Sequence, residues 1–445
     1  MRVSFASSIA ATCAAVLVLP ASPAAPAAAS VFPTAAALPP APDLPGATQS
    51  LPLVPLGTAT RAPGGARAGE QGLTRRDVRP FSLVGVVWDD PTVPLHGTVQ
   101  VRTRATGDGA WSDWQDVETH NEDHGADPDS AEGSARALRG STAPLWVGDS
   151  DGVEIRVRGA ELLPAGLRLE LVDPGEDPAD GPEAAAPRIR GAVAPAAAGA
   201  TGANDRLAPY GQAWIPALSK EETEITFRTT PGQEAVQSAA AQPYIGPRPK
   251  IITRKGWGAD ERIRETGFVY TKTIKTAFVH HSATGNNYTC SQAPSVLRSI
   301  YRYHVKSSGW RDIGYNFAVD KCGNIYEGRA GGVAKPVRGA HTLGFNNDST
   351  GIAVLGTFTS TNPPAAVLTA VARLTAWKLG LHGVNPKGTA YLVSGGGNLY
   401  KKGTKVRFNT IAGHRDGFAT ECPGGRLYDK LGTARTSSAN YQGRS

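Results

Sequence analysis

The sequence predicts an α/β domain at residues 247–433, preceded by a small all-β, sandwich-like domain at residues 77–174 and by Pro/Ala-rich linkers. Within 77–174, apolar and polar residues alternate in short runs, as expected for strands with one buried face. Within 247–433, strand-like runs are mixed with apolar residues at helical spacing, which is typical of an α/β domain. The chain's 34 prolines and 52 glycines are frequent in the Ala-rich tracts outside these two regions, and such tracts indicate linkers.

Residues 1–29 have the features of a secretory signal peptide. Arg2 provides a positive charge, the segment from Phe5 to Leu19 is apolar, and Ala27-Ala28-Ala29 form a small-residue cleavage site. The apolar segment is short for a bilayer span and ends at Pro20. We therefore expect the mature chain to be secreted and to have no integral membrane association after signal removal.

Residues 30–76 are expected to be a linker, because they contain too few large apolar side chains to offset the entropy of ordering. The all-β domain then begins. Clusters of Gly, Pro or Asp separate its expected strands, which are Phe81–Trp88, Gly97–Arg104, Trp111–Trp114, Gly152–Arg158 and Leu167–Val172. Trp88, Trp111 and Trp114 fit either a domain core or a platform that binds a polymer.

Residues 175–246 are again rich in Ala, Pro and Gly and predict a second linker, with one apolar island at Trp214–Phe227. Beyond it, strands are expected at Lys275–His281 and Gly351–Phe358. Residues 434–445 are expected to be a C-terminal tail. Two helices are expected from apolar residues on one face, with Leu297, Ile300, Tyr301 and His304 on the first and Val367, Val371 and Leu374 on the second.

The formal net charge of +7 favours an anionic partner, such as nucleic acid, anionic lipid or an anionic wall polymer. The sequence has no dense run of Lys and Arg interleaved with aromatic residues, so we do not expect nucleic acid binding. Removal of the signal peptide leaves Cys290, Cys322 and Cys422. An odd count in an oxidising compartment indicates one disulfide and one thiol with another role, such as metal binding.

Two clusters carry the residue types of a metal site. His280 and His281 end a predicted strand, and because side chains alternate along a strand only one of them faces a given site. His414 and Cys422 lie in a later loop bounded by Gly and Pro. Two imidazoles and one thiolate suit a tetrahedral zinc ion whose fourth position is open to water, as in catalytic sites. The alternative is that these are ordinary strand-end and loop residues.

The motifs in and between these clusters resemble the peptidoglycan recognition protein and type 2 N-acetylmuramoyl-L-alanine amidase family. They occur in the family's order and cover about two-fifths of the chain. The matching segments are Val279-His-His-Ser-Ala283, Gly309-Trp-Arg-Asp-Ile-Gly-Tyr-Asn-Phe317, Ile325-Tyr-Glu-Gly-Arg329, Gly339-Ala-His-Thr-Leu-Gly-Phe-Asn346, Gly351-Ile352, Gly413-His-Arg-Asp416 and Thr420-Glu-Cys-Pro-Gly424.

This resemblance implies a central mixed β-sheet flanked by helices and a zinc-dependent hydrolase that cuts the amide between the lactyl group of N-acetylmuramic acid and L-alanine. His280, His414 and Cys422 match the family's zinc ligands. Tyr315 matches the tyrosine beside the metal, and Thr420 takes a position where phage-type relatives carry a lysine. Because some family members bind without cutting, the alternative is a non-catalytic peptidoglycan-binding protein.

The resemblance also implies residues that bind the substrate and a cell-wall location. His304 and His341 match positions that line the muropeptide groove, and Arg329 and Asn346 are further candidates for contact with the glycan or with peptide carboxylates. With Cys422 assigned to the metal, Cys290 and Cys322 are left to form the disulfide. We expect peptidoglycan or a muropeptide as the partner, with other anionic wall polymer as a further candidate.

Overall fold

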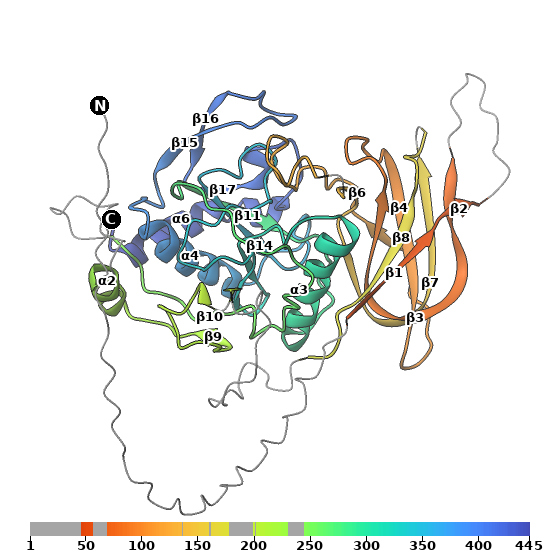
Figure 1. The fold of residues 1–445 in the computed structure, drawn as a ribbon, viewed down its shortest axis with the longest axis horizontal. Helices are drawn as coiled ribbons and strands as arrows, with labels where there is room; N and C mark the ends of the chain where they lie inside the picture. Colours follow the sequence, from red (N-terminus) through yellow and green to blue (C-terminus); the bar gives the residue numbers. More distant parts are fainter. Residues whose placement is uncertain are drawn as a thin grey trace, which may run out of the picture. The chain divides into compact units, whose positions relative to one another are not determined.

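The computed structural model describes residues 46–56, 69–135, 137–159, 162–177, 199–200, 202–229 and 244–445. The expected signal peptide lies outside these ranges. Within them, no helix is both long enough and apolar enough to cross a bilayer. Most described strands belong to two separate sheets, one formed early in the chain and one late (Figure 1).

The early sheet is antiparallel and has eight strands. Its order is β1 (Ala47–Pro52), β8 (Arg168–Asp173), β3 (Glu70–Trp88), β7 (Leu145–Gly159), β4 (Gly97–Ala105) and β5 (Gln115–Val117), while β2 (Val54–Pro55) and β6 (Gly140–Ser141) also pair with β3. Its apolar side chains, among them Val84, Val101, Ile155 and Leu169, form one buried cluster. The expected all-β domain is therefore present.

The boundaries of this sheet differ from those that the composition suggested. β1 lies within the expected linker 30–76, pairs with β8 along its whole length, and is followed by Leu53, which is buried in the core. β3 begins at Glu70 because Leu73 is also buried there. The expected strand Trp111–Trp114 is not a strand. Only an isolated bridge joins Trp111 to Arg104, and β5 begins after Trp114.

The late sheet is mixed and has seven strands. Its order is β17 (Ile411–Gly413), β11 (Thr276–His281), β14 (Ser349–Val354), β12 (Phe317–Val319), β13 (Ile325–Glu327), β10 (Ile251–Ile252) and β9 (Trp214–Ile215). β11 is parallel to both β14 and β17, and all six of its residues are buried. Strands β15 (Thr389–Val393) and β16 (Lys405–Asn409) form a separate hairpin.

Helices cover both faces of this mixed sheet, as the α/β prediction required. On one face, Val279 and Val354 share a cluster with residues of α4 (Ala365–Gly380) and α6 (Leu431–Gln442). On the other face, Ala318 and Ala353 share a cluster with residues of α3 (Ala293–Arg302). A short α5 (Gly425–Tyr428) precedes α6. Because side chains alternate along a strand, Phe278 and His280 face away from the α4 side.

Three further segments differ from expectation. The island in the expected linker 175–246 is ordered, with β9 extending the mixed sheet and α2 (Lys220–Thr229) burying Phe227 in its core. The expected tail 434–445 instead continues α6, whose Ala434 is buried against the same cluster. The first helix ends at Arg302 and continues as a π-helical turn, Tyr303–Ser307, that contains His304. A disulfide joins Cys290 to Cys322.

Candidate metal centre

The sheet brings the predicted metal ligands together. His280 lies at the carboxyl end of β11, and His414 directly follows β17. These strands are parallel neighbours, with Val279 paired to Gly413, so their carboxyl ends meet at the same edge of the sheet. The two imidazole centroids are 4.4 Å apart. Cys422 lies in the loop after His414, and its Sγ is 3.8 Å from Nδ1 of His280.

A fourth donor comes from the all-β domain. His124 lies in the segment between β5 and β6, and one donor atom from each of His124, His280, His414 and Cys422 lies within 4.8 Å of the others. Neighbouring ligands of a tetrahedral zinc ion are about 3.3–3.7 Å apart, and imidazole and thiolate are ligands that zinc prefers. The donor types therefore suit a zinc ion, and the four donor atoms are grouped closely enough to converge on one.

Asp123 fixes the orientation of two of these imidazoles. Its Oδ1 lies 2.8 Å from Nδ1 of His124, and its main-chain oxygen lies 3.1 Å from Nε2 of His414. If each ring nitrogen donates its proton there, lone pairs remain on Nε2 of His124 and Nδ1 of His414. Among the described residues, these two nitrogens are buried and have no hydrogen-bond partner. A carboxylate or carbonyl behind a metal-binding histidine sets the tautomer in the same way.

Burial controls the protonation of the group. It lowers the pKa of His414 to about 3 and that of His280 well below its usual value, so both rings are neutral and able to bind a metal at neutral pH. Burial also raises the pKa of the Cys422 thiol well above its usual value. A bound cation would counter this effect, because coordination deprotonates a thiol.

The two predicted catalytic residues lie beside the four donors. The ring centroid of Tyr315 is 5.5 Å from that of His280, and burial raises the pKa of its phenol well above the usual value, which keeps it a hydrogen-bond donor. The hydroxyl of Thr420 accepts a hydrogen bond from the Cys422 main-chain N–H at 3.1 Å. Both residues line a small cavity of about 10 Å³, roughly the space one water molecule needs.

The four predicted substrate-binding residues are all buried. Nδ1 of His304 accepts a hydrogen bond from the Gly314 N–H, and its ring packs on Trp310. The His341 ring lies 5.2 Å from that of His280. The side chains of Arg329 and Asn346 contact the segment that carries His124, as described below. These side chains, expected to line the muropeptide groove, are therefore covered in this structure.

His281 is not part of the donor group. Its Nδ1 accepts a hydrogen bond from the Phe358 N–H at 3.3 Å, in line with the expectation that alternation turns it away from His280. His124 was missed by the sequence analysis, because it lies far from the other donors in a different domain. The spacing of His120 and His124 within an Asp- and Glu-containing segment is the one signal that could have marked it as a ligand.

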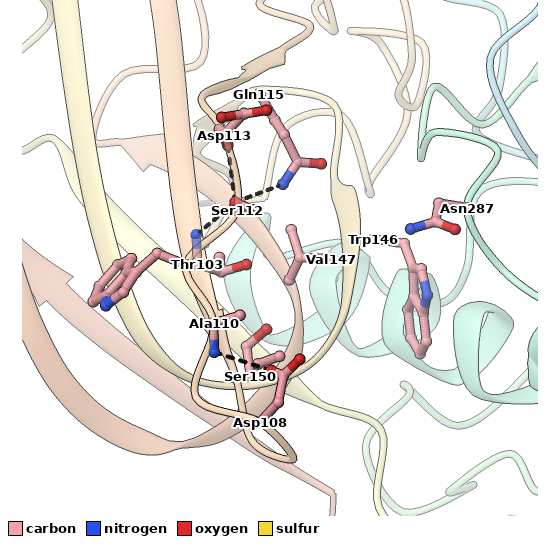
Figure 2. A pocket seen from close by; sticks show the side chains of 12 residues that line it. Thr103, Asp108, Ala110, Ser112, Asp113, Gln115, Trp146, Val147, Ser150 and Asn287 are labelled. Carbon is pink, nitrogen blue, oxygen red and sulfur yellow. Dashed lines mark hydrogen bonds between the residues drawn. The ribbon is translucent and has the colours of Figure 1, made fainter.

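A larger cavity of about 360 Å³ is lined by the all-β domain together with Asn287 of the α/β domain (Figure 2). Trp146 and Asn287 lie on one side of it, and Ser112 and Ser150 lie on the other. Trp111 lines the cavity, and Arg75 lies over its ring. Trp114 is packed under Arg102 and Arg156. Trp88 is a core residue, since it is buried and donates a hydrogen bond to the Val93 carbonyl.

Known protein families match both the all-β domain and the α/β domain of the chain. A family model described as N-acetylmuramoyl-L-alanine amidase matches residues 270–425, and one described as Rv3811 N-terminal galactose-binding domain-like matches residues 34–195. The peptidoglycan-recognition proteins SC2 of Drosophila simulans and Drosophila melanogaster are each 30% identical over 185 residues, which is 41% of this chain and 85% of each relative. Peptidoglycan-recognition protein SA of Drosophila melanogaster is 31% identical over 168 residues, 38% of this chain and 76% of the relative.

Among solved structures, wild-type Drosophila PGRP-LB is 28% identical and covers 41% of this chain and 92% of its own, with a TM-score of 0.33. The matches fall on the region that holds His280, His414 and Cys422, and on the all-β region that holds His124. By sequence, the chain belongs to the family of peptidoglycan recognition proteins and type 2 N-acetylmuramoyl-L-alanine amidases.

Proposed function

We propose that this protein is a secreted, zinc-dependent N-acetylmuramoyl-L-alanine amidase, which hydrolyses the bond between the lactyl group and L-alanine in peptidoglycan. The observation that carries the proposal is the convergence of His280, His414 and Cys422 beside the phenol of Tyr315. A pure binding site has no need of a buried thiol beside two neutral imidazoles. Such a set is common where a protein holds a catalytic zinc ion.

Each side chain has a role that its position supports. His280, His414 and Cys422 would hold zinc, which when bound lowers the pKa of a water molecule and polarises a carbonyl. Tyr315 keeps its proton because it is buried, so its hydroxyl can donate a hydrogen bond to the oxyanion that develops on the scissile carbonyl. The Thr420 hydroxyl, bound to the Cys422 N–H, would orient the attacking water.

The proposed location and substrate agree with other features of the chain. Residues 1–29 resemble a signal peptide, and the Cys290–Cys322 disulfide suits an oxidising compartment. The net charge of +7 favours an anionic wall. The relatives' names describe recognition of peptidoglycan. We propose peptidoglycan or its muropeptide fragments as the substrate and a cell-wall-associated location.

Mass spectrometry of digested sacculi tests this function. Purified sacculi would be incubated with zinc-loaded protein, with chelator-treated protein and with Cys422→Ala. His124→Ala would be included because the segment around His124 covers the site. We expect soluble peptides with a free L-alanine amino terminus from zinc-loaded His124→Ala, fewer from zinc-loaded wild type, and none from Cys422→Ala. If every variant binds sacculi without creating new amino termini, the protein is a recognition protein and the amidase proposal is wrong.

A further inference from the structure

We propose that residues 118–135, here called the plug, keep the amidase site latent by supplying His124 as a fourth metal ligand and by filling the substrate groove. This inference rests on the proposed function. The plug belongs to the all-β domain, since it directly follows β5 and the chain then returns to β6 in the same sheet. A catalytic zinc site keeps one position open, whereas a site with four protein ligands is closed.

The position of His124 indicates a ligand and not a packing residue. Its ring centroid lies 4.6 Å from that of His414 and 5.4 Å from that of His280. Its Nδ1 is held by Asp123 at 2.8 Å, which leaves Nε2 as the ring nitrogen available to a metal. Within the described part of the chain this buried Nε2 has no hydrogen-bond partner. A buried polar atom without a partner is unfavourable, and a metal ion would supply that partner.

The second half of the plug is held by polar contacts in the groove. Both carboxylate oxygens of Glu132 bind the guanidinium of Arg329, each at 2.8 Å, and both side chains are almost fully buried. Oδ1 of Asp127 accepts hydrogen bonds from the Asn346 side chain at 2.8 Å and the Gly344 N–H at 2.9 Å. Its Oδ2 accepts one from Arg338 at 2.8 Å.

These contacts use the groups that an anionic peptide would need. Arg329 and Asn346 are two of the residues expected to bind the substrate, and the plug presents carboxylates to both. Bidentate contacts between arginine and carboxylate are strong and directional. A stem peptide also carries carboxylates, so it would have to displace Glu132 and Asp127 before it could bind. The plug thus acts as an intramolecular competitor of the substrate.

The sheet from which the plug extends is itself packed against the amidase domain. The Tyr303 hydroxyl lies 3.2 and 3.1 Å from the main-chain oxygens of Val86 and Thr142 and shares its one proton between these two acceptors. A Cβ atom at Gly85 would lie 2.4 Å from that hydroxyl, so the two domains are closely packed there. Leu83 and Trp146 share an apolar cluster with residues of α3. Opening the site therefore requires movement of the plug itself, while this packing can remain.

Cobalt substitution tests the inference without relying on activity. Full-length wild type and His124→Ala would be loaded with Co²⁺, and their visible absorption would be titrated with azide. We expect azide to shift the cobalt bands of His124→Ala, in which the fourth position is open, and to leave those of wild type unchanged. Equal azide responses in the two proteins would overturn the inference. So would complete loss of cobalt from a folded His124→Ala, because His124 would then be an indispensable structural ligand.

A second pair of variants loosens the plug while keeping His124. Glu132→Gln weakens the buried contact with Arg329, whereas Asp129→Asn removes an exposed ion pair with Lys402 in the same segment. We expect Glu132→Gln to cut sacculi about tenfold faster than wild type, because it populates the open state more often, and Asp129→Asn to match wild type. Equal cutting rates for wild type, Glu132→Gln and Asp129→Asn would contradict the inference that the plug blocks the site. If the azide titration gives the expected difference but no variant cuts sacculi, the amidase proposal is wrong and the inference about the plug is retained.

Discussion

The main-chain oxygen of Asp123 accepts a hydrogen bond from Nε2 of His414 at 3.1 Å, although the two residues are 291 positions apart. Nδ1 of His414 is then left without a hydrogen-bond partner among the described residues, and Oδ2 of Asp123 lies 3.6 Å from it. The all-β domain therefore contributes both a donor, His124, and the bond that orients another. The group of four donors is thus shared by two regions of the chain that separate family models match.

Loss of the thiolate should remove the metal. Cys422→Ala deletes the softest of the donors and is expected to lower the zinc content from about one ion per chain to near zero. Zinc would be measured by elemental mass spectrometry after gel filtration. His281→Gln is a matched control, because His281 is also buried at the end of β11 but hydrogen-bonds Phe358. Equal zinc in Cys422→Ala and wild type would contradict the assignment.

Removal of the Tyr315 hydroxyl should slow catalysis and leave the zinc content unchanged. Tyr315→Phe keeps the buried ring beside His280 and deletes only the donor to the oxyanion. Loss of one such donor lowers kcat by about 10²–10³-fold, so we expect that decrease with KM and zinc content almost unchanged. Steady-state kinetics in the His124→Ala background would measure it. An unchanged kcat would exclude Tyr315 from the chemistry.

The sequence predicted three members of the four-residue donor group: Cys422 from the odd number of cysteines in an oxidising compartment, and His280 and His414 from motifs that resemble the family's. It missed His124 because no local pattern connects a β-domain loop to a site formed by β11 and β17. Periodicity placed His304 on an α-helix, but hydrogen bonding within Tyr303–Ser307 is π-helical. The composition predicted a linker at residues 30–76, but Ala47–Pro52 form a strand that pairs with β8. Pairing between segments this far apart in the chain cannot be predicted from amino-acid composition.

A buried carboxyl in the amidase domain predicts a pH-dependent stability. Burial raises the pKa of Glu327 to about 7 from 4.5, with hydrogen bonds from the Asn204 side chain and the Arg254 N–H opposing the rise. A raised acid pKa adds stability that is fully present below about pH 4.5 and is lost as the pH rises through about 7. Because Gln does not titrate, the free energy of unfolding of wild type relative to Glu327→Gln should fall across this range by an amount on the order of 3 kcal/mol.

Urea unfolding of both proteins at about pH 4.5 and pH 8 would measure this difference. Other titrating groups are common to the two proteins and cancel in the comparison. A stability difference that stays constant between the two pH values would show that Glu327 has the same protonation state in the folded and unfolded chains.

The disulfide should stabilise the amidase domain. Cys290 and Cys322 are 32 positions apart, and closing a loop of this length contributes about 3–4 kcal/mol in the chain-entropy model. Replacing both cysteines with serine is expected to lower the melting temperature by about 6–16 °C, at roughly 2–4 °C for each kcal/mol. A reducing agent should lower the melting temperature of wild type and leave that of the double variant unchanged. Equal melting temperatures for wild type and the double variant, both measured without reducing agent, would rule out this contribution.

Isotope incorporation tests the central claim most directly. Sacculi would be digested in water enriched in ¹⁸O with zinc-loaded His124→Ala, and the products would be analysed by tandem mass spectrometry. An amidase places one ¹⁸O atom in the lactyl carboxylate of muramic acid and releases a peptide with an unlabelled L-alanine amino terminus. We predict this labelling, and its absence with Cys422→Ala. Label in a peptide carboxylate, or no label in either product, would contradict the account.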